Sequence, residues 1–302
     1  MKVKGVFAAP FLMIVVLALF GISGFLDNAA LGVNPYLALI IVQLIVYALP
    51  SVFFCRLRGK SYMSRLRLRF VKPGHMFLLV CALLAILSGS ALLNLGMITL
   101  FPSGDFNTAS AAYASAATGD FDGMLYVILA FCILPALLEE FLFRGIMTAE
   151  YESSGIMTAV SMSALLFAMM HLSFMRLPAY FFSGIVLCLT MYATRSVFAP
   201  MIVHAANNIA ALWMDRYLYT AVDGIGERGT LLVFILFTVL FISVIAFTAS
   251  AQRIYAAYGI TNTPSPHVPK KKRGEFGGFF SAALAPPFVF LFVLFVIFTA
   301  VS

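Results

Sequence analysis

The chain has 302 residues, of which 63% are apolar and 10% charged, with 19 lysine and arginine residues against 12 aspartate and glutamate residues. Soluble domains are about half apolar and about a quarter charged, so this composition excludes a soluble globular protein. It also excludes a disordered chain, because disorder requires low hydrophobicity. We therefore expect an all-α, polytopic transmembrane bundle that forms a single integral membrane domain over residues 1–302.

Nine apolar segments approach or exceed the length that crosses a bilayer, which is about 20 residues at 1.5 Å per residue. They predict eight or nine transmembrane helices, and whether the last one spans stays open because Pro286 and Pro287 shorten it. The segments are residues 6–26, 36–55, 75–100, 124–138, 156–174, 179–194, 200–218, 231–249 and 282–300.

The distribution of basic residues predicts the orientation of the bundle. If the N-terminus is cytoplasmic, all lysines and arginines except Arg176, Arg216 and Arg228 fall on the cytoplasmic side, as the positive-inside rule requires. Residues 250–285 are then a basic, proline-rich cytoplasmic connection. The basic stretch at 56–72 is interpreted as a lipid-surface anchor. Nucleic acid is not an expected partner, and the oligomeric state is left open.

The fourth apolar segment leads into two adjacent carboxylates, Glu139 and Glu140, flanked by apolar residues. Ionisable groups at membrane depth are costly and therefore indicate function. If the helix continues to about Glu152, Glu140 and Arg144 lie at i and i+4 on one face and are expected to form an ion pair. Glu139 is turned by about 100° and is left as the carboxylate available for general base catalysis.

Two later segments carry polar residues at the same helical spacing. Phe167 and His171 are four residues apart in the fifth segment, and His204 and Asn208 are four residues apart in the seventh. A single buried histidine or asparagine often only bonds a neighbouring helix. Together with Glu139, however, these residues are of the types that activate water and stabilise an oxyanion.

Helix length gives a partial test of whether these residues can meet. Glu139 and His171 are each about 22–25 Å from a turn near residues 153–155, so they can lie at one depth. His204 follows Pro200 closely, so the turn at 195–200 must be sunk into the protein or its helix must be strongly tilted. The sequence leaves both alternatives open.

The strings EEFLFR at 139–144, FAMMH at 167–171 and HAANN at 204–208 resemble the motifs EExxxR, FxxxH and HxxxN of the CPBP family of intramembrane proteases. This family is also called the CAAX-protease and bacteriocin-processing, or Abi, family and includes the type II CAAX prenyl endopeptidase. The resemblance covers a motif-bearing core at about residues 124–218. All three motifs are matched without a departure.

The resemblance implies hydrolysis of a peptide bond in a membrane-associated, prenylated or precursor peptide. The inside-positive topology and the lack of a eukaryotic sorting signal indicate a bacterial plasma membrane. Glu139 and His171 would then activate water, and His204 and Asn208 would bind the oxyanion. Glu140, Arg144 and Phe167 would support them.

The metal requirement is left open by these residues. Glu139, His171 and His204 would suit a catalytic zinc, yet no HExxH motif is present. A metal-free, glutamate-dependent mechanism without a cofactor is preferred.

Two other classes of protein remain as alternatives. A non-catalytic membrane scaffold or bacteriocin-immunity protein could keep the same motifs. A secondary transporter is less consistent with the sequence, because its polar residues are confined to one block rather than paired between two halves.

Overall fold

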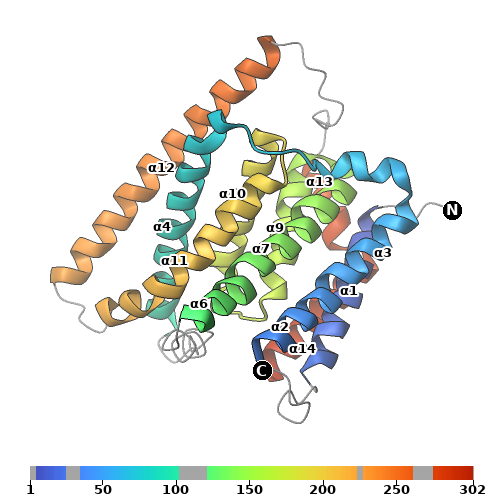
Figure 1. Ribbon diagram of the computed structural model, residues 1–302, viewed down its shortest axis with the longest axis horizontal. Helices are drawn as coiled ribbons and strands as arrows, with labels where there is room; N and C mark the ends of the chain where they lie inside the picture. Colours follow the sequence, from blue (N-terminus) through green and yellow to red (C-terminus); the bar gives the residue numbers. More distant parts are fainter. Residues whose placement is uncertain (1–4, 25–34, 102–120, 223–226, 261–274, 302) are drawn as a thin grey trace.

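The computed structural model describes residues 5–24, 35–101, 121–222, 227–260 and 275–301, and every regular element in these ranges is helical. Figure 1 shows the helices side by side as a bundle, with α12 at one edge and α1, α2, α3 and α14 at the other. The elements of the first half are α1 (Gly5–Ser23), α2 (Pro35–Gln43), η1 (Leu44–Ala48), α3 (Leu49–Arg58), η2 (Lys60–Leu66), η3 (Pro73–His75), α4 (Met76–Leu100), α6 (Phe121–Val127), η4 (Ile128–Ile133) and α7 (Leu134–Glu140). Those of the second half are η5 (Phe141–Met147), α8 (Thr148–Tyr151), η6 (Glu152–Ser154), α9 (Ile156–Met170), α10 (Leu177–Thr194), α11 (Phe198–Val222), α12 (Glu227–Ile260), α13 (Glu275–Ala283) and α14 (Pro286–Val301).

The predicted all-α membrane bundle is confirmed, and the chain is an integral membrane protein. Six helices of the described part are long and apolar enough to cross a membrane, or seven if the bent pair at the C-terminal end counts as one span. They are Gly5–Ser23, Tyr36–Arg58, Pro73–Leu100, Met124–Ser154, Leu177–Thr194 and Gly229–Tyr258, with the pair Gly277–Ala283 and Pro286–Ala300 bent by 60°. The fifth and seventh predicted segments appear as shorter apolar helices, Ile156–Met170 and Phe198–Leu212.

The prolines explain the bend near the C-terminus. Pro286 and Pro287 begin α14, where a missing N–H costs nothing, but they cannot continue a preceding helix. The predicted connection at 250–285 is also more helical than expected, because α12 runs to Ile260 and α13 begins at Glu275. The remainder of that connection, residues 261–274, lies outside the described residues.

The main hydrophobic core surrounds the helix that carries the paired carboxylates. Buried side chains from α1, η5, α8, α9 and α14 form one cluster, in which Met13, Phe143, Tyr151 and Phe167 are almost completely enclosed. By contrast, only 6% of the apolar window of α12 is buried. This contrast identifies α12 as a lipid-facing wall packed mainly on α4 (Figure 1).

Arginines from the basic stretch at 56–72 pair with acidic residues at the end of the fourth span. Arg58 binds Glu150, and Arg67 binds Glu152 with an N–O distance of 2.5 Å. The hydroxyl of Tyr192 also donates to Glu152, at 3.0 Å. The interpretation of this stretch as a lipid anchor is therefore too broad, since these two arginines bind the protein itself.

The turn between α10 and α11 is buried, which brings His204 to the depth of the carboxylates on α7. Ser196 and Val197 have no exposed surface. The Val197 N–H donates to the carbonyl of Arg67 at 3.0 Å, and the Ser196 hydroxyl donates to the carbonyl of Arg69. Of the two alternatives left by the sequence, the structure shows a turn that is sunk beneath another segment.

Candidate active site

Glu139 and Glu140 are the last residues of α7, and a π-helical turn, η5, follows them directly. Such wide turns disturb the backbone hydrogen bonds of a helix and occur often at functional sites. Here the carbonyl of Phe143 accepts hydrogen bonds from the hydroxyls of Thr148 at 3.0 Å and Ser163 at 2.8 Å. These hydroxyls satisfy the displaced carbonyl, and Ser163 also ties α9 to the turn.

Glu140 is fully buried, and one of its oxygens accepts hydrogen bonds from both Arg144 and His204. Its Oε1 accepts from Arg144 Nη1 at 2.7 Å and from His204 Nδ1 at 2.8 Å. Arg144, also fully buried, donates through Nη2 to the carbonyl of Gly184 at 3.3 Å. The ion pair predicted from the i and i+4 spacing is thus present, and it extends to a histidine 64 residues away.

The ring of Phe167 is the apolar centre of the cluster. The Arg144 guanidinium lies over this ring at 4.3 Å from its centroid. The rings of His171 and His204 meet it edge to face, with centroids 4.7 Å and 5.6 Å away. Phe167 therefore touches Arg144, His171 and His204, and its face stabilises the arginine through a cation–π contact.

His171 is held in one orientation at the end of α9. The predicted segment ran to residue 174, but α9 ends at Met170 because Leu172 adopts a left-handed conformation with φ of 47°. The His171 Nδ1 lies 2.9 Å from the carbonyl of Phe167. Its ring also stacks on Tyr180, with centroids 3.8 Å apart and an interplanar angle of 23°.

Glu139 is half-buried and differs from Glu140 in having no cation bonded to it. Its Oε2 is a buried atom without a hydrogen-bond partner among the described residues. The carboxylate interacts electrostatically with His204, Glu140 and Arg144, and also with the phenol of Tyr47 on η1. Glu139 therefore adjoins the cluster but is left available for an external group.

Asn208 lies one turn beyond His204 on α11 and is half-buried. In the described part of the chain, no hydrogen bond ties its amide to the cluster. The structure thus brings Glu140, Arg144, Phe167, His171 and His204 into direct contact, with Glu139 adjacent, and places Asn208 on the same helix as His204.

The zinc alternative does not fit this arrangement. Glu139, His171 and His204 have suitable donor atoms, yet the described residues contain no group of three histidine, cysteine, aspartate or glutamate side chains placed to hold a metal ion. We therefore derive no chemical step through a metal.

Sequence reasoning missed Tyr180 and Gly184. Tyr180 carries no motif signal, and only packing reveals that it stacks on His171. Gly184 lies so close to α9 that an added Cβ would be 2.8 Å from the Cα of Ala164. A small residue in an apolar helix is a known sign of close helix packing and could have drawn attention to this position.

Comparison with known proteins finds similarity over the same part of the chain. Residues 121–210 match the model of the family described as type II CAAX prenyl endopeptidase Rce1-like. Over this core, the chain is similar to the Rce1-like, or CPBP, family. All of the cluster residues fall within the Rce1-like core.

A curated relative extends the comparison to a bacterial protein. The chain is 30% identical over 83 residues to the membrane-embedded CAAX protease MroQ of Staphylococcus aureus (strain USA300), an alignment that covers 25% of this chain and 34% of MroQ. The chain thus spans about a third of the length of this relative. No solved structure matches the chain.

Proposed function

We propose that the chain is an intramembrane endopeptidase that hydrolyses a peptide bond with water activated by Glu139 and His171. The observation that carries this proposal is the half-buried Glu139 carboxylate, which has one buried oxygen without a partner among the described residues and adjoins the cluster that holds His171 and His204. An acid or base poised next to such groups is typical of proteolytic water activation. The similarity of the core to the Rce1-like family and the similarity to MroQ support the same activity.

The orientation of His171 suits a group that positions water. A carbonyl can only accept a hydrogen bond, so the Nδ1 that faces Phe167 carries the proton. The neutral ring then presents the lone pair of Nε2, which can accept a hydrogen bond from the attacking water. Tyr180 stacks on the ring and keeps this nitrogen in a fixed direction.

His204 is arranged as a charged donor to the oxyanion. Glu140 is bonded to Arg144 and is therefore ionised, so the Nδ1 of His204 carries a proton. In its imidazolium form the ring can also donate from Nε2 to the oxyanion, while Nδ1 is held by Glu140. Asn208 is proposed as the second donor, and one such donor is worth about 3 kcal/mol.

The reaction then proceeds in two steps. Water attacks the peptide carbonyl while Glu139 takes one of its protons, and the oxyanion that forms is held by His204 and Asn208. Glu139 returns the proton to the amide nitrogen as the carbon–nitrogen bond breaks. The mechanism requires no cofactor.

The substrate that we propose is a membrane-associated peptide, either prenylated at a CAAX-type C-terminus or a precursor peptide. The site is built from membrane helices, so the scissile bond must lie close to the bilayer. We place the enzyme in a bacterial plasma membrane with a cytoplasmic N-terminus, on the basis of the positive-inside distribution and the staphylococcal relative.

The test is a comparison of Glu139→Gln with a matched carboxylate variant outside the cluster, Glu152→Gln. The full chain is purified in detergent and incubated with a library of prenylated and unprenylated membrane peptides, with and without a chelator, and products are read by mass spectrometry. We expect Glu139→Gln to reduce cleavage on the order of 10³-fold and Glu152→Gln to keep its activity per folded molecule.

Other results would contradict the mechanism, its metal-free form or the proposed activity. Cleavage that survives Glu139→Gln would overturn the mechanism, and activity that is lost on chelation and restored by zinc would overturn its metal-free form. A parent chain that cleaves no peptide of the library would favour the scaffold alternative.

A further inference from the structure

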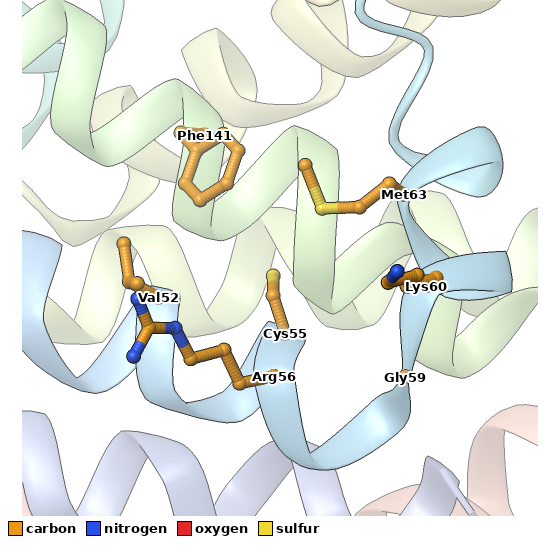
Figure 2. Close-up of a pocket in the computed structure, with 7 residues that line it drawn as sticks. All are labelled: Val52, Cys55, Arg56, Gly59, Lys60, Met63 and Phe141. Atoms are coloured by element: carbon orange, nitrogen blue, oxygen red, sulfur yellow. The ribbon is translucent and has the colours of Figure 1, made fainter.

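A pocket of about 330 Å³ lies between α3, the turn at Gly59, η2 and the first residue of η5. Its walls are apolar, formed by Val52, Cys55, Met63 and Phe141, whereas Arg56 and Lys60 are the charged residues that line it. Figure 2 shows the Phe141 ring and the Met63 side chain facing α3 across the pocket. The pocket therefore combines a positively charged edge with an apolar interior.

The two cations of the pocket differ from their neighbours in sequence. Arg58 binds Glu150, Arg67 binds Glu152, and Arg65 donates to the carbonyl of Ala149. Arg56 and Lys60 are exposed, and no carboxylate in the described ranges pairs with either of them. Two positive charges thus remain without a carboxylate partner among the described residues.

The surroundings of the pocket indicate that this ligand comes from the membrane. Arg56 lies in the last turn of the second span, at the level where a helix leaves the hydrocarbon core. Apolar side chains of the same helix, Phe53 at 61% and Leu57 at 70% exposure, face outwards toward lipid. Gly59, with φ of 87°, reverses the chain and places Lys60 at the same pocket as Arg56 (Figure 2).

The pocket is separate from the candidate active site. Phe141 and Glu139 are two positions apart on a continuous helix, so their side chains point about 200° apart in α-helical geometry. The side chain of Phe141 lines the pocket, and Glu139 adjoins the cluster of Glu140 and His204 on the other side. Binding at the pocket can therefore be measured independently of proteolysis.

We propose that this pocket binds one anionic phospholipid, with the phosphate on Arg56 and Lys60 and part of an acyl chain against Val52, Met63 and Phe141. Anionic headgroups attract basic residues at a membrane surface by about 1 kcal/mol per residue. The apolar walls add contact area that a free phosphate ion cannot use. The lipid is thus held at the π-helical turn that follows the paired carboxylates.

The experiment is native mass spectrometry of the full chain in detergent, titrated with phosphatidylglycerol, with phosphatidylcholine of the same acyl chains, and with inorganic phosphate. We compare the parent with the double variant Arg56→Gln and Lys60→Gln. The matched control is Arg69→Gln with Lys72→Gln, which removes the same charge from exposed positions of the same basic stretch outside the pocket. A third variant, Val52→Trp, fills the pocket without changing the charge.

We expect one saturable phosphatidylglycerol site that the pocket double variant weakens by about thirtyfold, as two contacts of about 1 kcal/mol would require. Val52→Trp should also weaken it, and the control pair should not. Thermal unfolding of each variant shows whether it is folded.

Three results would overturn the proposal. They are equal binding of the two phospholipids by the parent, an equal loss in the control pair, or binding of inorganic phosphate as tight as that of the lipid.

Discussion

Two groups of acidic and basic residues in this protein differ in how their carboxylate oxygens are partnered. At the end of the fourth span, Glu150 and Glu152 each bind an arginine, and Glu152 also accepts from Tyr192. In the cluster on α7, Glu140 binds Arg144 and His204, yet one oxygen each of Glu139 and Glu140 is buried without a partner among the described residues.

This difference indicates which charges stabilise the fold and which are available for a reaction. A fully partnered buried charge holds segments together, because its desolvation is offset by several hydrogen bonds. An unpartnered buried carboxylate is costly and is retained where an external group, here a water or a peptide, completes it. We therefore assign the Glu150 and Glu152 pairs to the scaffold, and we propose that Glu139 belongs to the site.

The largest expected effect on stability comes from breaking the cluster rather than the scaffold pairs. Arg144→Met removes the cation from a carboxylate that has no exposed surface, and it also removes the cation–π contact with Phe167. We expect a loss of about 3–5 kcal/mol in the free energy of unfolding, measured by thermal or denaturant unfolding in detergent. Glu139→Gln should not share this loss, because Glu139 carries no ion pair. A fully stable Arg144→Met protein would contradict the comparison.

A smaller effect is expected for the corresponding change in the scaffold pairs. Arg67→Met leaves Glu152 with Tyr192 as its partner. The side chains of Arg67 and Glu152 lie at the end of the fourth span and are 8% and 9% exposed. We expect the unfolding free energy to fall by about 1–3 kcal/mol, while kcat per folded molecule stays unchanged. A fall in kcat of more than tenfold in the folded fraction would show that the Arg67–Glu152 pair affects catalysis. The division between scaffold pairs and active-site cluster would then be wrong.

The smallest effect concerns the residue that orients His171. Tyr180→Leu removes the ring that stacks on His171 and leaves the charge of the cluster unchanged. An aromatic pair is worth about 0.5–1.5 kcal/mol, so kcat should fall by about threefold to tenfold with little change in KM. Tyr180→Phe keeps the ring and should restore the rate. Failure of the phenylalanine variant to do so would indicate that the hydroxyl, not the stacking, is needed.

Much of the candidate site could be predicted from sequence because its signals are local. The spacing of Glu140 and Arg144 within one helix predicted their ion pair, and Phe167 and His171, noted for the same spacing, are in contact. The partner of His204 could not be predicted in this way. It lies 64 residues away, and Glu139 and Glu140 are equivalent candidates in the sequence.

The sequence by itself determined that this is a helical membrane protein and where its apolar segments lie, and it drew attention to the polar residues at membrane depth. Those properties follow from composition, helical period and the cost of charge in lipid. The tertiary structure decided that His204 binds Glu140, that Tyr180 stacks on His171, that the turn before α11 is sunk, and that Arg58 and Arg67 bind protein. Such contacts join residues far apart in the chain, and only the packing of whole helices selects among the partners that local pattern leaves open.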